Sequence, residues 1–262
     1  MNGRRPQTPR GPALLAFDID GTVLGQGDVP VPGVAPVLCE LAEAGVLLVP
    51  VTGRPLHGAL KAAGELGVAP AACVAYHGAL VVDLVSGEWL RHLTVPADLA
   101  AELAAAGLAG GLDVSLYVGD ERRDLPAGWA PPAAAGRPPE VAGVTRLVLA
   151  GDPQRVSPAM PALAQARAAG LRVEPVRPGV VVVLPAGTDK GEGLRLVAAH
   201  LGVPRARVVA CGDAAGDVTL LRAAAVGIAA GDAPEELRAA ATLTVGASGL
   251  PGALLQVFAR LP

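Results

Sequence analysis

Aromatic side chains are nearly missing from this sequence, which has only two each of Phe, Tyr and Trp among 262 residues. A hydrophobic core must therefore consist mostly of Ala, Val and Leu. Hydrophobic residues still make up 52% of the chain, so large-scale disorder is not expected. The length suffices for one large domain or two smaller ones.

Basic residues are not in excess, since 21 Lys and Arg stand against 24 Asp and Glu and the net charge is −3. This balance argues against a nucleic-acid partner, because neutralising phosphates requires a basic surplus. Cysteine is scarce too. Cys39, Cys73 and Cys211 lie far apart without a CxxC motif, which indicates buried free thiols in a reducing compartment.

Uninterrupted hydrophobic runs long enough for a membrane helix are missing as well. The uncharged stretches 66–82 and 239–259 are broken by proline and polar residues, so neither is a convincing span. The basic residues 1–12 are not followed by an apolar signal-peptide core, and we expect them to form a disordered tail. These absences predict a soluble, cytoplasmic protein with no membrane partner.

What the sequence does contain is a regular alternation of apolar strand-like and Ala/Leu-rich helical segments at both ends of the chain. This order predicts an α/β fold with a doubly wound, Rossmann-like parallel sheet, formed by residues 13–93 and 185–262. Residues 94–184 follow an α-β-β order twice, which predicts an inserted α+β domain. The helices expected there are 97–107 and 154–169, the strands 112–118, 144–150, 171–176 and 179–184, and the loop 119–142.

The stretch LLAFDIDGTVL, residues 14–24, places Asp18 and Asp20 at the end of an apolar strand. Carboxylates so close together repel each other, and burying them without a cation or a hydrogen-bonding partner is costly. A simple Asp-Gly turn is the ordinary interpretation of such a stretch. The alternative is that a positive group, such as a metal ion, lies against both carboxylates.

Three further stretches are expected at the same rim, because ligands bind at the carboxyl ends of parallel strands. They are VTGR with Thr52, GTDKGEGL with Lys190, and VVACGDAAGDVTLL with Asp213 and Asp217. Each alone is explained by helix capping or by a solvated lysine. Together they indicate one site, because each lies at a strand end or a helix start.

The joint chemistry of these residues is coherent. Carboxylate oxygens select a hard cation such as Mg²⁺, and a lysine, a hydroxyl and helix amides suit a phosphate group. A carboxylate can attack phosphorus to give an acyl phosphate. Its neighbour can protonate the leaving oxygen and later activate water.

The four motifs closely resemble those of the haloacid-dehalogenase-like (HAD) phosphatase superfamily, in its Cof-like branch with an inserted type IIB cap. The resemblance covers nearly the whole chain from Leu14 onward. It implies that residues 94–184 form the cap. The resemblance implies that Asp18 is the nucleophile and Asp20 the general acid/base. It implies phosphate binding by Thr52, Gly53 and Lys190, with Arg54 beside the phosphate. The implied Mg²⁺ ligands are Asp18, Asp20 (through its carbonyl), Asp213 and Asp217.

Two departures from the family pattern matter. Gly216 stands where the family usually has Asn, which puts hydrogen bonds around the metal in doubt. His77-Gly78 replaces the usual Asn-Gly after the third strand, so His77 either lines the pocket or is a surface turn residue. In the cap, a solvated loop is the alternative to substrate contact. The cap candidates for reading the leaving group are Asp120, Glu121, Arg122, Arg123 and Trp129 in the loop, and Arg172, Glu174 and Arg177 near the return to the core.

The sequence therefore predicts a Mg²⁺-dependent phosphomonoester hydrolase that acts through a phosphoaspartate on a small phosphorylated metabolite, such as a sugar phosphate. One alternative is a phosphotransferase or phosphomutase on the same fold. Another is a binding or regulatory protein that has lost turnover. Nothing in the sequence marks a second phosphate site, which favours hydrolysis over transfer. The sequence determines neither the substrate's identity nor the oligomeric state.

Overall fold

The computed structural model describes residues 11–129 and 143–261. Residues 1–10 of the predicted tail lie outside this range, as do residues 130–142 of the predicted loop. Within the described ranges, no helix is both long and apolar enough to span a membrane. The division into domains at residues 94 and 184 stays a prediction.

Strand β1 (Ala13–Phe17) is an interior strand of a five-stranded parallel sheet, the central sheet. It pairs with β11 (Val208–Gly212) on one side and with β2 (Val46–Pro50) on the other. Strands β12 (Val226–Ala230) and β13 (Leu243–Val245) follow beyond β11, also in parallel. The predicted doubly wound parallel sheet is confirmed, and β1 is buried along its whole length, as a strand covered on both faces must be.

The side chains of β1 alternate between two hydrophobic layers, one on each face of the sheet. Leu15 and Phe17 belong to one layer, and Leu14 and Ala16 belong to the other. The helices that contribute to the first layer are α1 (Val34–Glu43), α2 (Leu56–Glu65) and α8 (Leu250–Arg260), and those in the second are α5 (Lys190–His200), α6 (Val218–Ala223) and α7 (Glu235–Ala240). Both faces are thus covered, which leaves the ends of the strands as the open edge.

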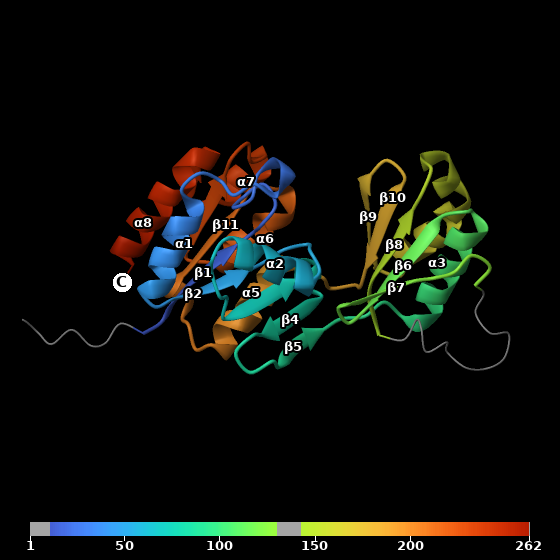
Figure 1. Cartoon of the computed structure of the whole chain (residues 1–262), viewed down its shortest axis with the longest axis horizontal. Coiled ribbons are helices and arrows are strands. Elements are labelled where there is room, and N and C mark those ends of the chain that lie inside the picture. The colour runs from blue at the N-terminus through green and yellow to red at the C-terminus, as the bar shows by residue number, and fades with distance from the viewer. Residues whose placement is uncertain (1–10, 130–142, 262) are drawn as a thin grey trace, which may run out of the picture.

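Strand β3 (Ala72–Ala75) extends the central sheet through a parallel bridge between Val51 and Val74. It then pairs antiparallel with β4 (Leu80–Asp83), which pairs with β5 (Trp89–His92). Strands β4 and β5 form an antiparallel hairpin. They carry the chain from the central sheet to a second body (Figure 1).

The second body is an antiparallel five-stranded sheet in the order β7-β6-β8-β10-β9, which we call the cap sheet. Two helices cover one of its faces, and Figure 1 shows α3 on the side that points away from the central sheet. We call the sheet and its helices the cap. Its elements are α3 (Ala97–Ala109), β6 (Asp113–Val118), β7 (Glu121–Asp124), β8 (Val144–Ala150), α4 (Met160–Ala168), β9 (Arg172–Arg177) and β10 (Val180–Leu184).

Strand β7 falls within the predicted loop 119–142, so the cap follows an α-β-β-β-α-β-β order in place of the predicted α-β-β-α-β-β. All four residues of β7 are charged and exposed at the edge of the sheet. No apolar alternation therefore marks the segment as a strand.

Candidate active site

The four motif stretches meet at the carboxyl-terminal edge of the central sheet. Asp18 follows β1 and Asp213 follows β11, and the Asp18 N–H donates to the Cys211 carbonyl at 3.0 Å. Lys190 is the first residue of α5, whose N-terminus is capped by the Asp189 side chain. Residues from distant parts of the chain therefore converge, as parallel strand topology requires.

The Lys190 side chain is buried between two carboxylates. Its Nζ donates to Asp18 Oδ1 at 2.7 Å and to Asp217 Oδ1 at 2.6 Å. Asp18 and Asp217 are themselves buried. The start of a helix is an unfavourable place for a cation, so these two carboxylates are what stabilises the ammonium group there.

Asp217 is held by backbone groups although Gly216 supplies no side chain. Its Oδ2 accepts hydrogen bonds from the N–H groups of Asp213 (3.2 Å) and Ala214 (3.1 Å). A Cβ at position 216 would meet only Arg172 Nη2 within 4 Å. The glycine thus leaves free space next to Asp217 while the backbone still orients its carboxylate.

Asp213 supplies a third carboxylate. Its Oδ1 accepts from Thr22 Oγ1 at 2.8 Å, and a Cβ at Gly21 would lie 2.1 Å from its Oδ2. Because Gly21 also has φ of +86°, only glycine fits there. One oxygen from each of Asp18, Asp213 and Asp217 lies within 4.8 Å of the others.

This carboxylate cluster has a surplus of negative charge, because three carboxylates share the single Lys190 ammonium. Burial raises the pKa of Asp18 to about 7, against the lowering effect of Lys190 and with a further increase from Asp217. The pKa of Asp213 is also raised, mainly by burial. A divalent cation would balance the remaining charge, and carboxylate oxygens are ligands that Mg²⁺ prefers. The residues present therefore fit Mg²⁺.

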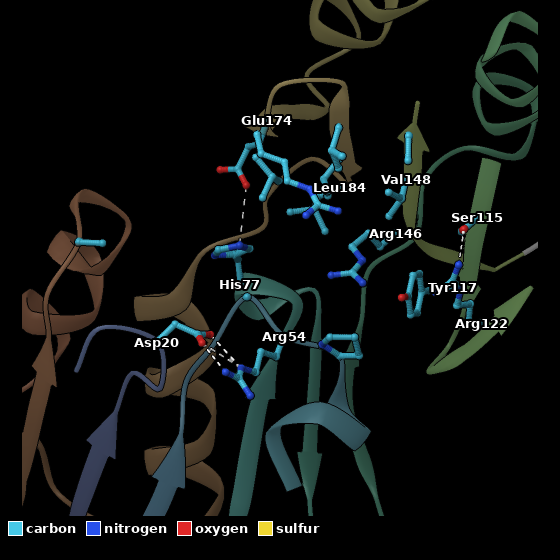
Figure 2. A pocket seen from close by; sticks show the side chains of 18 of the residues that line it. Asp20, Arg54, His77, Ser115, Tyr117, Arg122, Arg146, Val148, Glu174 and Leu184 are labelled. Carbon is cyan, nitrogen blue, oxygen red and sulfur yellow. Dashed lines mark hydrogen bonds and ion pairs between the residues drawn. The ribbon is translucent and has the colours of Figure 1, made fainter. Parts of the chain in front are cut away.

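The Asp20 side chain lies outside this cluster and is largely exposed. Arg54 Nε donates to its two oxygens at 3.1 and 2.9 Å, and Arg54 Nη2 contacts both Asp20 and Asp28. Arg54 therefore holds the Asp20 carboxylate at the rim, two residues along the chain from Asp18 (Figure 2).

The VTGR motif forms a turn that is tied to the loop after β3. The Thr52 N–H donates to the Val74 carbonyl at 2.8 Å, and the His77 N–H donates to the Thr52 carbonyl at 2.9 Å. The Thr52 hydroxyl is buried and accepts from the Arg54 N–H at 3.1 Å. A Cβ at Gly53 would lie 2.3 Å from His77 Nε2, so a glycine is needed for the imidazole to approach.

His77 lies beside this turn with little exposure. Its Nε2 is 3.7 Å from Glu174 Oε2, and its buried Nδ1 has no hydrogen-bond partner among the described residues. Burial lowers the pKa of His77 to about 3, with smaller contributions from Lys190, Arg172 and Arg146. The imidazole is therefore neutral at pH 7 and faces a group of cations.

A cavity of about 760 Å³ separates the edge of the central sheet from the cap sheet (Figure 2). Cap strands contribute Tyr117, Arg146 and Glu174 to its wall, together with apolar valines. The predicted site residues that line it are Asp18, Asp20, Gly53, Arg54, His77, Arg122, Glu174, Arg177 and Lys190. Most of the predicted site therefore shares one cavity.

The other predicted site residues are not part of the cavity lining. Asp213 and Asp217 belong to the carboxylate cluster with Asp18, and Arg172 contacts Glu174. Thr52 is buried behind the turn that it stabilises. Arg123 contacts Glu121 on its own strand, and Trp129 packs against the hydrophobic layer between the cap sheet and its helices. Substrate contact by Arg123 or Trp129 gains no support from this geometry.

A sequence model of the haloacid dehalogenase-like hydrolases matches residues 15–122 and 140–249. The chain belongs to this family. The match spans both the central sheet and most of the cap, and it includes all four motifs. It confirms the family predicted from those motifs, and with it an enzyme of the HAD-like phosphatase class.

Several individual proteins that are similar to this hydrolase are named as phosphatases or as haloacid dehalogenase-like hydrolases. The HMP-PP phosphatase of Serratia proteamaculans is 26% identical over 244 residues, which is 86% of each chain. A haloacid dehalogenase-like hydrolase from Bacteroides thetaiotaomicron has a similar structure, with a TM-score of 0.80, 22% identity and coverage of 94% and 99% of the two chains. A sugar phosphatase of HAD subclass IIB has a TM-score of 0.71, 18% identity and coverage of 94% and 98%.

Asp120 joins the cap to the core of the hydrolase, a contact that sequence reasoning missed. It lies in the turn between β6 and β7, and its carboxylate accepts from the N–H groups of Leu56 (2.7 Å) and His57 (2.9 Å) at the start of α2. It also accepts from Tyr76 Oη at 2.7 Å. A carboxylate is favoured at a helix N-terminus, so this contact stabilises the cap in place over the cavity.

Replacing Asp120 with Ala is expected to loosen the cap and to lower kcat/KM by about 10-fold or more, because misplaced catalytic and substrate groups react slowly. Small-angle scattering should show a larger radius of gyration. Glu121→Ala is the matched control, since Glu121 lies in the same hairpin and its side chain contacts Arg123. Unchanged activity and size in Asp120→Ala would contradict a role in holding the cap.

Proposed function

We propose that this hydrolase cleaves phosphomonoesters with Mg²⁺, and that Asp18 is its nucleophile. The observation that carries the proposal is the buried Asp18–Lys190–Asp217 arrangement beside Asp213, at the core side of the cavity. Lys190 can bind the oxygens of the phosphoryl group while it orients Asp18. Mg²⁺, held by Asp18, Asp213 and Asp217, would neutralise charge on the phosphoryl oxygens.

Two displacements would complete the reaction. In the first, an Asp18 carboxylate oxygen forms a bond to phosphorus as the bond to the leaving oxygen breaks, and Asp20 gives that oxygen a proton. In the second, Asp20 takes a proton from water, whose oxygen attacks phosphorus and releases phosphate from Asp18. Arg54 supports both steps because it holds Asp20 at the rim.

The proposed substrate is a small phosphorylated metabolite. A cavity of about 760 Å³ has room for a sugar-sized leaving group. Further support comes from the names of similar proteins, an HMP-PP phosphatase and a sugar phosphatase. The three cysteines are free thiols, in agreement with the proposed cytoplasmic location.

A phosphotransferase or a binding protein would differ from this proposal in its products. A transferase would move phosphate to an added alcohol, and a binding protein would retain a phosphate analogue without turnover. Release of inorganic phosphate from p-nitrophenyl phosphate and from hexose phosphates tests hydrolysis directly.

Removal of the metal is expected to stop this hydrolysis. Activity should fall to background in excess chelator and return when Mg²⁺ is added. The reason is that three carboxylates and one ammonium give the site two negative charges, which a divalent cation would neutralise. Mg²⁺ should also raise Tm in the absence of substrate, since it binds only the folded site. Full activity in chelator would contradict metal dependence.

A further inference from the structure

Arg146 is a cavity residue that no motif marks. It lies on β8, and its guanidinium carbon is 4.1 Å from the centre of the Tyr117 ring and 5.3 Å from that of Tyr76. Its Nε is buried and has no hydrogen-bond partner among the described residues. The guanidinium therefore lies against two aromatic rings, and the donor at its Nε is unused.

The other buried or half-buried cations of the cavity have carboxylate partners. Lys190 contacts Asp18, and Arg54 contacts Asp20. Arg146 has no such ion pair within the described parts of the chain. A partly buried, unpaired charge is costly unless a ligand compensates it, so the cavity carries a positive charge that its own residues leave free.

The pairing of the cap strands places Arg146 at the end of the cap sheet nearest the reacting groups. Arg146 lies opposite Tyr117, whereas the next row on the same face holds Ser115 and Val148. Arg146 also reaches over the ring of Tyr76, which is next to His77 in the core. Its guanidinium thus lies at the junction of cap and core (Figure 2).

We propose that Arg146 binds a second anionic group on the leaving part of the substrate, so that this hydrolase prefers phosphate esters that also carry a carboxylate or another phosphate. The inference rests on the proposed function, because it assigns the leaving group of that reaction. A guanidinium presents parallel donors that match either anion.

His77 supports this assignment. The imidazole lies within reach of the cationic field of Lys190, Arg172 and Arg146, and it is neutral at pH 7. Its buried Nδ1 is, like Arg146 Nε, without a partner among the described residues. Two polar atoms without partners, beside the unpaired guanidinium of Arg146, suit an anionic ligand with several oxygens.

The test compares matched pairs of substrates that differ in the second anion. Suitable pairs are glucose 6-phosphate with 6-phosphogluconate, fructose 1-phosphate with fructose 1,6-bisphosphate, and phenyl phosphate with phenyl diphosphate. The enzymes are the natural protein, Arg146→Gln, Arg146→Lys and the control Arg167→Gln. Arg167 lies on α4, exposed and outside the cavity lining.

The natural protein is expected to prefer the doubly anionic member of at least one pair. Arg146→Gln should reduce that preference, measured as the ratio of kcat/KM values, by about 10- to 100-fold, since hydrogen bonds between charged groups are strong. Arg146→Lys should restore part of it, and Arg167→Gln should leave the ratio as it is. Circular dichroism of the Arg146 variants shows whether they are folded.

The outcomes separate this inference from the proposed function. Hydrolysis that requires Asp18, with the same ratio in Arg146→Gln as in the natural protein, would overturn the role of Arg146 alone. Preference for the singly anionic member of every pair would do the same. Failure to hydrolyse any of the six esters with Mg²⁺ present would overturn the proposed function and this inference together.

Discussion

Replacement of Asp18 by Asn is expected to lower kcat for aryl phosphate hydrolysis on the order of 10⁴-fold or more, because loss of a covalent nucleophile removes the reaction path itself. Asn keeps the size of the side chain and an oxygen that can accept the hydrogen bond from Lys190. The variant should therefore fold, and its circular dichroism should match that of the natural protein.

The measurement is steady-state release of phosphate with saturating Mg²⁺. Asp152→Asn is a matched control, because Asp152 is exposed in the cap and its carboxylate caps only a local turn at Gln154. Residual activity of Asp18→Asn within 10-fold of the natural protein, at an unchanged sensitivity to chelator, would show that another group attacks phosphorus.

Replacement of Lys190 by Met is expected to destabilise the protein by about 3–5 kcal/mol and to remove most of its activity. The substitution leaves the carboxylates of Asp18 and Asp217 buried without their shared cation, and breaking a buried ion pair on one side has a cost of this size. Loss of a charge that stabilises the transition state should lower kcat by about 10²- to 10³-fold.

Lys61 provides the control, since it is the other lysine of the chain. It is exposed on α2 and lies 3.8 Å from Glu65. Lys61→Met should change the free energy of unfolding by less than about 1 kcal/mol, as expected for an exposed pair. Urea denaturation of both variants without Mg²⁺ measures the difference. Equal stability of Lys190→Met and Lys61→Met would contradict the role given to the buried ion pairs.

The central part of the site follows from sequence because its geometry is fixed by regular structure. Asp18 and Asp213 each end a buried apolar strand, and Lys190 begins a helix. Once those strands are parallel, their carboxyl ends must share an edge. The contact between Asp18 and Lys190, 172 positions apart, is a consequence of that topology.

The cap residues that line the cavity could not be predicted in the same way. Their placement depends on a strand pairing for which the sequence has no recognisable pattern. Residues 121–124 carry no apolar alternation, so a loop is the natural prediction. As strand β7, the segment pairs Arg122 with Tyr117 and Arg123 with Leu116, and neighbouring side chains point to opposite faces. Arg122 therefore lines the cavity and Arg123 does not.

Arg146 and Asp120 show a second reason why the sequence does not predict the contacts between the cap and the core. An arginine within a strand and an aspartate in a Gly-Asp turn are ordinary in sequence, and only the placement of the cap against the core gives them partners. Asp120 reaches α2 and Arg146 reaches Tyr76, both across that boundary. Contacts between two different sheets leave no local pattern in the sequence, since the hydrophobic periodicity of one sheet does not constrain the other.

The stereochemical course at phosphorus tests the two-step account most directly. The measurement uses a thiophosphate ester that is chiral at phosphorus through oxygen isotopes. It is hydrolysed in water enriched in a third oxygen isotope, and the configuration of the released thiophosphate is determined. Each in-line displacement inverts phosphorus, so transfer to Asp18 as an acyl phosphate and then to water predicts overall retention. Inversion would mean a single direct displacement and would contradict the nucleophilic role of Asp18.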